Sequence, residues 1–533
     1  MKTPRFIKMR KRSEPDLPER GPIWLGNNSN GEYFHQQTPY ERKLHKFILQ
    51  KCDENARKLG MSRRDFLASA MGMTTSLWCI NMASGCSSDH SIGHNVGKSA
   101  PKGDGGMDSG SARPAACKGY NIEPEMMYDE QAACAAISGS EFIFDIQTHY
   151  FETDGQWIKT NPGYVNVIKV LTGTSDFGQD HYLDLIFCQS DTKVAVLTCW
   201  PGVLCNADAS NLPCGLPMST DGAAAARDAI NKMANSQRLL SHAMILPDDP
   251  SGVQAQLDIM EHIACTSGVS AWKLYPAFGY NGMGFFMDDP ATGIPVIEKG
   301  LELNVKNFAI HKGLPIPGFD IPHNDPRDIG PVAAMYPTAN FIIYHAAINA
   351  NMSTHEGPYV EGDTTGVNAL ITSMKANGIG PNQNVFAELG SSWIQVMTDA
   401  TQAAHYLGKL LKYVGENNVC WGTDSMVYGT PQPQIEALRA ATIPQDLQDQ
   451  YGYPALTDDI KAKIFGLNSA VVYGVDPKQR HCQIEKCQMS SLKQMLDDEL
   501  GARRWTFQEP YGPRTYVEYL ESAEKERARG RHA

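Results

Sequence analysis

Residues 142–149 read FIFDIQTH, an apolar run that ends in His149. Three later apolar runs also end in a histidine or an aspartate: NFAIH at 307–311, NFIIYH at 340–345 and NVCWGTD at 418–424. A buried strand is a poor place for a lone imidazole or carboxylate, because an unpaired polar group there costs about 1–3 kcal/mol. Four such endings therefore indicate that the strands deliver these side chains to one shared place.

These runs belong to a longer pattern of eight apolar runs. The eight are 142–150, 193–200, 240–247, 269–276, 307–313, 340–347, 384–391 and 418–425. Their near-continuous apolar character is typical of strands that are covered on both faces. Segments with helical spacing separate them, among them 223–239, 253–264, 296–303, 367–374 and 398–414. Eight strands that alternate with helices predict an α/β fold, the (β/α)8 TIM barrel.

The barrel explains why polar side chains end four of the runs. In such barrels the active site lies at the C-terminal ends of the strands. His149, His311, His345 and Asp424 end the first, fifth, sixth and eighth runs, so we expect them to meet on one rim. Three imidazoles and a carboxylate suit a divalent first-row metal. The residues alone therefore predict a metal-dependent enzyme.

Charge is spread unevenly along the 533 residues. The net charge is −12, yet residues 1–64 hold 15 Lys and Arg against 7 Asp and Glu, a net of +8. The remainder is therefore near −20, which is −12 minus +8. An acidic body argues against nucleic acid as a partner and leaves a small-molecule substrate as the expectation. No apolar run reaches the ~20 residues of a membrane-spanning helix.

A basic motif lies ahead of the barrel region. The sequence SRRDFL at 62–67 precedes a weakly apolar stretch that ends in ASGC at 83–86. The first motif resembles a twin-arginine export signal, with an ordinary amphipathic helix as the alternative. The second resembles a lipobox, whose Cys86 would carry a lipid anchor. These resemblances imply export by the twin-arginine machinery, to the periplasm or to a membrane through the lipid.

Five segments follow from these patterns. They are an N-terminal extension (1–60), the twin-arginine signal region (61–86), a flexible linker (87–140), the barrel (141–476) and a helical C-terminal extension (477–533). The last is expected to cap the barrel or to form a homo-oligomer contact. In an oxidising compartment three cysteine pairs could form disulfides, with free thiols as the alternative. The pairs are Cys117/Cys134, Cys205/Cys214 and Cys482/Cys487.

Short motifs also follow one another in order along the barrel region. They are DIQTH at 145–149, SDTKVAVL at 190–197, WKLYP at 272–276, HKG at 311–313, PRDIGP at 326–331, YH at 344–345, WGTDS at 421–425 and GLNSA at 466–470. In this order they resemble the amidohydrolase-related branch of the amidohydrolase superfamily, which includes aminocarboxymuconate-semialdehyde decarboxylase. The resemblance covers roughly residues 141–476.

The resemblance implies a role for each strand-end residue. The family binds metal through His-x-His on its first strand, where this chain has Gln147 and His149. His311 and Asp424 resemble the ligands of strands 5 and 8, and His345 resembles the strand-6 histidine, a ligand or the base acting on water. Asp424 is the alternative proton acceptor. A carboxamide oxygen is a poorer zinc ligand than imidazole and suits harder metals. The resemblance implies Zn²⁺ as the cofactor. Because of Gln147, the alternatives are Mn²⁺, Mg²⁺ or loss of the metal.

Four further residues are candidates for a supporting or substrate-contacting role. Lys273 corresponds to a lysine that is carbamylated and bridges two metals in some family members, but an ion pair with Glu388 is the preferred interpretation. Glu388 itself is expected next to the ligands or the substrate, as is His323 in the loop after the fifth strand. Arg327 is expected to cap a helix or pair with Asp328, with a substrate carboxylate as the alternative partner.

The resulting interpretation is an exported hydrolase that uses metal-activated water on a C–O or C–N bond of a small molecule, such as a lactone or amide. The same constellation of residues fits non-oxidative decarboxylation of an unsaturated or aromatic acid. Because Gln147 replaces a family histidine, a barrel that binds a ligand without catalysis is the third hypothesis.

Overall fold

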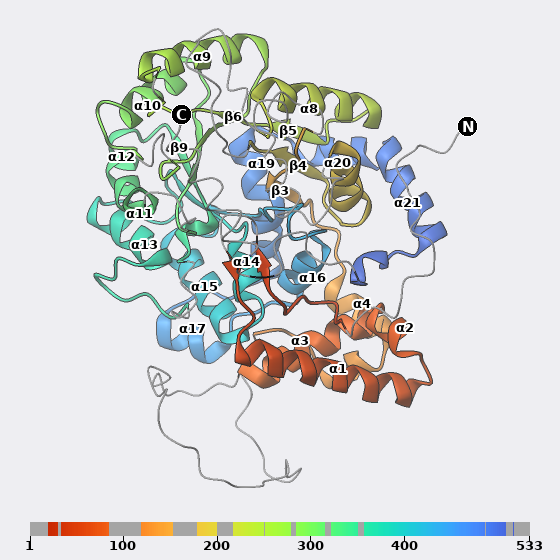
Figure 1. Cartoon of the computed structure of the whole chain (residues 1–533). Helices are drawn as coiled ribbons and strands as arrows, with labels where there is room; N and C mark the ends of the chain where they lie inside the picture. The colour runs from red at the N-terminus through yellow and green to blue at the C-terminus, as the bar shows by residue number, and fades with distance from the viewer. Residues whose placement is uncertain are drawn as a thin grey trace.

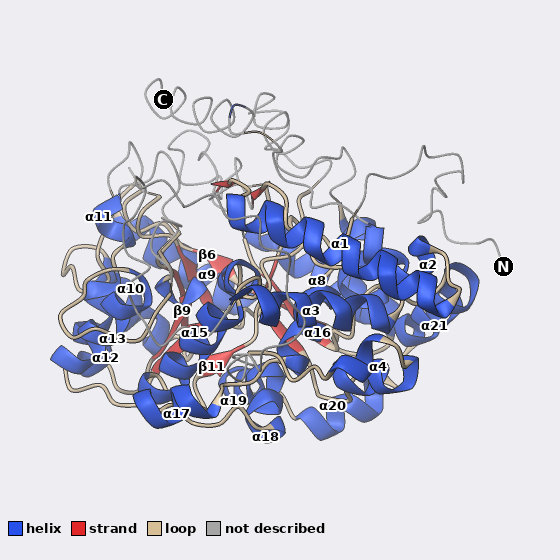
Figure 2. Cartoon of the chain, turned by 90° about the horizontal axis from the view of Figure 1, so that it is seen from below, coloured by secondary structure: helices blue, strands red, loops and turns tan. Residues whose placement is uncertain are grey.

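The computed structural model describes most of the chain (Figure 1). The described residues are 20–29, 34–84, 119–152, 178–199, 217–249, 251–278, 284–314, 321–349, 356–485, 487–507, 515 and 517. The protein is a mixed α/β structure with parallel sheets. Strands occupy the centre of the molecule and helices surround them (Figure 2).

Every apolar run that was predicted to be a strand contains one. The strands are β3 (Phe144–Thr148), β4 (Val194–Leu197), β5 (Leu239–Ser241), β6 (Ala243–Met244), β7 (Trp272–Leu274), β8 (Asn307–His311), β9 (Asn340–Tyr344), β10 (Val385–Glu388) and β11 (Val419–Cys420). They form one sheet of order β3-β4-β5 and a second of order β6 to β11. Only His242 separates β5 from β6, so these two strands continue one run from sheet to sheet.

Backbone hydrogen bonds also join the first strand to the last. Ile146 N donates to Trp421 O at 3.0 Å, and Asp424 N donates to Gln147 O at 2.8 Å. Thr148 and Ser425 form a parallel bridge. Neighbouring strands therefore pair in succession from β3 around to β11 and back. This strand order agrees with the (β/α)8 arrangement expected from the sequence.

The segments with helical spacing are helices. Between the strands lie α7 (Gln179–Leu183), α8 (Thr220–Ala234), α9 (Val253–Thr266), α10 (Gly293–Glu302), α11 (Ile321–Asn324), α12 (Ile329–Met335), α13 (Gly366–Ala376), α14 (Ser392–Val396) and α15 (Ala400–Tyr413). After β11 come α16 (Gln432–Ala440), α17 (Gln445–Tyr451), α18 (Asp458–Ala462) and α19 (Asn468–Tyr473). Residue type fixes their starts: the Asp399 carboxylate, for example, accepts from the first free amides of α15, Thr401 N and Gln402 N.

The N-terminal region is folded onto this scaffold. It contains a short hairpin, β1 (Asn28–Ser29) with β2 (Phe34–His35), and the helices α1 (Pro39–Leu59), α2 (Arg63–Leu67) and α3 (Ala70–Ser84). Phe66, Met73, Leu77 and Ile80 are fully buried and share one apolar core with the barrel helices. Ser84 Oγ accepts from Ala400 N at 2.8 Å, which ties the end of α3 to α15.

The flexible linker expected over 87–140 is corrected in its second half. Residues 124–127 form the 3-10 turn η1, and 130–137 form α4. Asn81 Nδ2 donates to Tyr120 O at 2.7 Å, and Tyr120 is fully buried. The sequence from 119 onward therefore packs instead of linking, because Tyr120, Met127 and Ile137 supply apolar anchors. Cys86 and Cys117 lie outside the described residues.

The chain after the barrel is helical. It forms α20 (Pro477–Ile484), α21 (Gln488–Leu500) and the turn η7 (Arg504–Phe507). Cys134 and Cys487 carry free thiols, whereas Cys205 and Cys214 lie outside the described residues. A search of the described helices finds none with the length and apolarity needed to cross a membrane.

Candidate active site

The four strand-end side chains are buried and meet in pairs. His149 and Asp424 come from β3 and from the segment after β11, and His149 Nε2 lies 2.9 Å from Asp424 Oδ1. His311 ends β8 and His345 follows β9, and His345 Nε2 lies 3.2 Å from His311 Nδ1. None of the four is more than 1% exposed. The fold thus brings His149 to Asp424, 275 positions later in the sequence, and His311 to His345. That all four surround one ion stays a prediction.

Backbone carbonyls orient two of the imidazoles. His149 Nδ1 donates to Thr198 O at 2.9 Å, and His345 Nδ1 donates to Gly390 O at 2.8 Å. A carbonyl only accepts, so it fixes the proton on Nδ1. In both rings Nε2 is then the atom that faces the neighbouring side chain, Asp424 for His149 and His311 for His345. This is the outer-shell arrangement that commonly orients a metal-ligating histidine.

The backbone is strained where these side chains are presented. His345 has φ 62°, Ser391 has φ 53° and Asp424 has φ 60°. Residues other than glycine rarely occupy this left-handed region, and each instance costs on the order of 1–3 kcal/mol. Ala346 and Ala347 share the same conformation after β9. Such strain concentrates at functional sites, so its presence at three contacting segments supports this location for the site.

Gln147 lies beside the Asp424 carboxylate. Its Nε2 donates to Asp424 Oδ1 at 3.0 Å, and its Oε1 is buried with no hydrogen-bond partner among the described residues. Gly390 makes room for this oxygen, because a Cβ at that position would lie 2.1 Å from it. The amide oxygen is therefore the atom that could serve as the fourth ligand expected from the sequence.

Charge at the site is shared between Asp424 and the histidines. Burial opposes ionisation of Asp424, but the hydrogen bond and charge of His149 together lower its pKa. Ser391 Oγ also donates to Asp424 Oδ2. Burial lowers the pKa of His345 to about 4, against the attraction of Asp424. The site thus combines an ionised carboxylate with a neutral imidazole at neutral pH.

Two further carboxylates hold the strand ends in place. Glu388 Oε2 accepts from His345 N at 3.0 Å, and its Oε1 accepts from Gly390 N. Burial raises the pKa of Glu388 well above its usual value. Asp145 accepts from the Thr423 amide at 3.1 Å and from the Thr423 hydroxyl, and burial raises its pKa to about 7. Both carboxyls fix the backbone that presents the ligands.

The preferred interpretation of Lys273 was wrong. Its Nζ lies 3.5 Å from the centre of the Tyr344 ring and 4.4 Å from that of Tyr275. Among the described residues, the contacts of Glu388 are with backbone amides, so the expected ion pair between Lys273 and Glu388 is replaced by cation–π contacts. Tyr275 in turn stacks on His311, with ring centres 5.0 Å apart. Lys273 thus supports the site through aromatic rings.

His323 and Arg327 pack on one aromatic ring. The His323 ring centre lies 4.3 Å from that of Phe286, and the Arg327 guanidinium carbon lies 4.0 Å from the same centre. The expected pair of Arg327 with Asp328 is corrected, because Asp328 bonds Lys312 Nζ at 2.9 Å. Both candidates are thus explained by packing, and a contact with substrate stays a prediction.

Sequence reasoning missed the residues that surround the four donors. Thr198 and Gly390 act through backbone carbonyls, which leave no trace in side-chain identity. Ser391 ends the seventh apolar run, so its position was visible. Serine is too common a residue type for this one to be singled out from sequence. Its hydroxyl contacts Tyr428 OH at 3.0 Å and also Asp424.

The donor atoms fit a divalent cation in kind, and the spacing within each pair fits two neighbouring ligands of one ion. At bond lengths of about 2.0–2.2 Å, neighbouring ligands of one ion lie about 3 Å apart, close to the two pair distances of 2.9 and 3.2 Å. The two pairs do not form one complete metal site in this structure. Among the described residues, no group of three or more His, Cys, Asp or Glu side chains is arranged to hold a metal ion. His149, His311 and Asp424 would hold the ion with Gln147 Oε1 as the fourth ligand, and His345 would stand beside them as a further ligand or as the base.

Comparison with known proteins gives one family. The sequence model of the family described as Amidohydrolase matches residues 220–475. No curated protein matches the chain. Among solved structures, a protein from Lactobacillus casei ATCC 334 assigned as a metal-dependent hydrolase aligns at 10% identity and a TM-score of 0.33, over 63% of this chain and 96% of its own. A TM-score this low carries no argument about fold or function.

The family match covers most of the site. It begins after β3 and β4, so it omits Gln147 and His149 but includes His311, His345 and Asp424. The family supports a metal-dependent hydrolase or decarboxylase in general, without naming the bond that is cleaved. Residues 220–475, which carry three of the four strand-end side chains, match the sequence model of the amidohydrolase family.

Proposed function

We propose that the protein is a metal-dependent hydrolase that cleaves a C–O or C–N bond of a small organic molecule, such as a lactone or an amide. The observation that supports this proposal is the two contacting pairs of buried donors at the strand ends, with one imidazole of each pair oriented by a backbone carbonyl. A histidine that donates Nδ1–H to a backbone carbonyl and leaves Nε2 for a ligand is the arrangement common to metal-binding histidines.

A divalent cation held by these donors supplies Lewis acidity, which polarises a carbonyl oxygen and makes water acidic enough to react near neutral pH. Zn²⁺ is the first candidate. Because Gln147 offers a neutral oxygen where the family has an imidazole, Mn²⁺ and Mg²⁺ are the alternatives.

The chain's own residues then divide the work. His345 is neutral at pH 7, since burial lowers its pKa to about 4, so its ring can accept a proton when the neighbouring charge changes. Asp424 stays ionised, because His149 lowers its pKa against the effect of burial. Glu388 and Gly390 hold the loop that carries His345 at a fixed position. Burial of all four donors keeps bulk water away from them.

Metal analysis of the freshly purified chain tests this proposal. We expect about one ion per chain, a large loss of metal in His311→Ala, and an unchanged content in His405→Ala. His405 is a matched control, because it is also a buried histidine but lies on α15, away from the strand ends. Its Nδ1 is 3.2 Å from Tyr453 OH. Turnover of a library of lactones and amides should follow metal content across these variants.

Three outcomes would replace the proposal. Release of CO₂ from carboxylic acids, without incorporation of water, would assign the site to decarboxylation. Tight binding of a ligand without metal and without turnover would assign it to a binding protein. Metal that stays bound in His311→Ala would place the metal elsewhere.

Export by the twin-arginine route, with or without a lipid at Cys86, is also a proposal. The position of the motif adds a condition to it. Arg64 is exposed, but Phe66 and Leu67 are buried beneath it. For the export machinery to read the apolar stretch, or for a protease to remove it, α3 would have to leave its place in the core.

A further inference from the structure

The short loop between β10 and α14 contacts both pairs of donors at the candidate active site. The Gly390 carbonyl accepts from His345 Nδ1 at 2.8 Å. The next residue, Ser391, donates its hydroxyl hydrogen to Asp424 Oδ2. Gly390 also lies against Gln147, since a Cβ at that position would be 2.1 Å from Gln147 Oε1. Two neighbouring residues of one loop therefore join the two donor pairs.

Ser391 uses its hydroxyl in an unusual way for its position. It directly precedes α14, where a serine hydroxyl usually accepts a hydrogen bond from an amide of the first helical turn. Within the described chain, Ser391 makes no capping bond of this kind to α14. Its backbone has φ 53°, in the left-handed region where a residue other than glycine is strained, and its side chain is fully buried. The residue thus gives up a local bond and accepts backbone strain, while its hydroxyl contacts Asp424.

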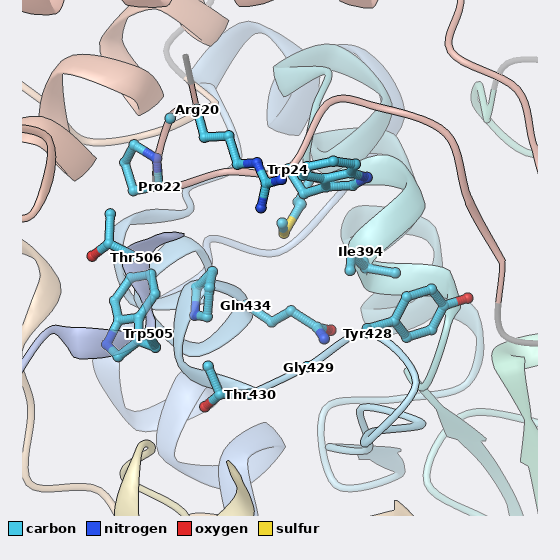
Figure 3. Close-up of a pocket in the computed structure, with 13 residues that line it drawn as sticks. Arg20, Pro22, Trp24, Ile394, Tyr428, Gly429, Thr430, Gln434, Trp505 and Thr506 are labelled. Atoms are coloured by element: carbon cyan, nitrogen blue, oxygen red, sulfur yellow. The ribbon is translucent and has the colours of Figure 1, made fainter. Parts of the chain in front are cut away.

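Tyr428 holds the Ser391 hydroxyl from the other side. Its OH lies 3.0 Å from Ser391 Oγ. Because the hydroxyl hydrogen of Ser391 goes to the carboxylate, Tyr428 is the donor in this contact. Tyr428 lines a small pocket with Arg20 and Trp24, and its hydroxyl points away from the centre of that pocket (Figure 3). Tyr428 is also buried, so this hydrogen bond is shielded from bulk water.

The two oxygens of Asp424 therefore have different surroundings. Oδ1 lies 2.9 Å from His149 Nε2 and accepts from Gln147 Nε2 at 3.0 Å, whereas Oδ2 accepts from Ser391. The bond to Ser391 opposes rotation of the carboxylate, so it keeps Oδ1 among the donor side chains. Outer-shell hydrogen bonds of this kind orient metal ligands, and their loss commonly weakens metal binding about 10–100-fold.

We propose that Ser391, held by Tyr428, is a positioning residue that fixes Asp424 for binding of the cation. The inference rests on the proposed function, because it takes Asp424 as a ligand. Ser391 acts only through the carboxylate of Asp424. Its hydroxyl sets how tightly the cation is held and which oxygen of Asp424 faces it.

A second buried pair of serine and tyrosine provides the control. Ser392, the next residue in the chain, donates its hydroxyl to Leu389 O at 2.8 Å and also contacts Tyr406 OH. Both Ser392 and Tyr406 are fully buried. Among the described contacts, neither bonds a donor of the candidate active site. The two pairs are thus matched in residue type and burial, and differ in what the serine holds.

Titration of the metal-free full-length chain with Co²⁺, followed by visible absorption, tests the proposal. The titration gives an affinity, and the spectrum reports how the ligands surround the ion. We expect Ser391→Ala to weaken Co²⁺ binding about 10–100-fold and to change the spectrum. Tyr428→Phe should weaken it about threefold, and should have no further effect in the Ser391→Ala background, because it acts through that hydroxyl. Ser392→Ala and Tyr406→Phe should leave the affinity and the spectrum unchanged.

Ser391→Gly separates the hydroxyl from the backbone conformation. Glycine adopts a φ of 53° without strain, so this variant relieves the strain but still removes the hydroxyl. It should weaken Co²⁺ binding at least as much as Ser391→Ala does. Affinity that is retained in Ser391→Gly would show that the hydroxyl does not position Asp424.

Two further outcomes would overturn the proposal alone. One is an unchanged affinity and spectrum in Ser391→Ala, which would leave the cation site in place without help from this hydroxyl. The other is an equal loss in Ser391→Ala and Ser392→Ala, which would point to general loosening of the loop. An unmodified chain that binds no Co²⁺ would overturn the proposed function and this inference together.

Discussion

The strand-end site and the N-terminal helices are both buried in this molecule, but for opposite reasons. At the site, polar side chains are buried because hydrogen bonds from neighbouring strands satisfy them, as Thr198 and Gly390 do for two histidines. In α3, apolar side chains are buried because they pack against α1, α4 and α15. Polar residues at the ends of apolar runs thus predicted where the site would lie. The apolar stretch of α3 was interpreted as part of an export signal, and its sequence did not reveal that the rest of the chain covers it.

The largest effect is expected from removing charge at the site. Asp424→Asn should lower kcat/KM by about 10³-fold or more, which corresponds to about 4 kcal/mol at 1.36 kcal/mol per factor of ten. The carboxylate contacts His149, Gln147 and Ser391, so its charge bears on every donor nearby. Steady-state kinetics on any substrate found in the library measures this. Asp458→Asn, on an exposed side chain of α18, should leave activity unchanged. Full activity in Asp424→Asn would remove the site from the chemistry.

The next effect concerns the support behind His311. Lys312 and Asp328 form a fully buried pair with Nζ 2.9 Å from the carboxylate. Lys312→Ala leaves the Asp328 charge buried without its partner and should cost about 3–5 kcal/mol of unfolding free energy. The double variant Lys312→Met with Asp328→Asn should recover most of this loss, since no charge is then buried. Denaturant unfolding measures both, and equal losses in the two variants would exclude the charge as the cause.

A third effect distinguishes a core helix from a detached segment. Leu77 of α3 is fully buried, so Leu77→Ala should cost about 2–5 kcal/mol in denaturant unfolding of the full chain. Leu59→Ala is the matched control, because Leu59 is 38% exposed at the end of α1 and should cost far less. If α3 does not pack on the barrel in solution, the two variants will unfold alike.

The strands, the helices between them and the position of four polar side chains at strand ends could be predicted from sequence, because each rests on a local pattern. Eight apolar runs with helical spacing between them need no knowledge of distant contacts, and His311 or Asp424 is conspicuous at the end of such a run. The partners of Lys273 and Arg327 could not be predicted in this way. Opposite charge suggested Glu388 as the partner of Lys273 and Asp328 as the partner of Arg327. In the structure, backbone amides donate to Glu388, and Lys312 pairs with Asp328.

The N-terminal region was the harder case for the same physical reason. Residues 119–137 follow a Gly- and Ser-rich stretch, and their composition does not reveal that Tyr120 is buried with bonds to Asn81 of α3 and to the Met397 carbonyl. The sequence of an apolar helix after two arginines also does not show whether its side chains contact a membrane, an export channel or the rest of the protein. Tertiary contacts decide such cases.

The smallest effect on stability is expected from the twin-arginine motif itself, which makes it the sharpest test of export. Arg63 Nε lies 3.1 Å from Asp53 Oδ1, with both side chains about one-third exposed, and Arg64 lies over the Phe507 ring. Exposed pairs of this kind contribute about 0–1 kcal/mol, so Arg63→Lys with Arg64→Lys should leave the unfolding curve almost unchanged. If the motif is a signal, cell fractionation should show the exported fraction falling to background in this variant, and staying normal in Arg57→Lys. Because lysine keeps the charge, such a loss would reflect recognition and not folding. An exported fraction that is insensitive to the change would leave these arginines with only their contacts on the surface of α2.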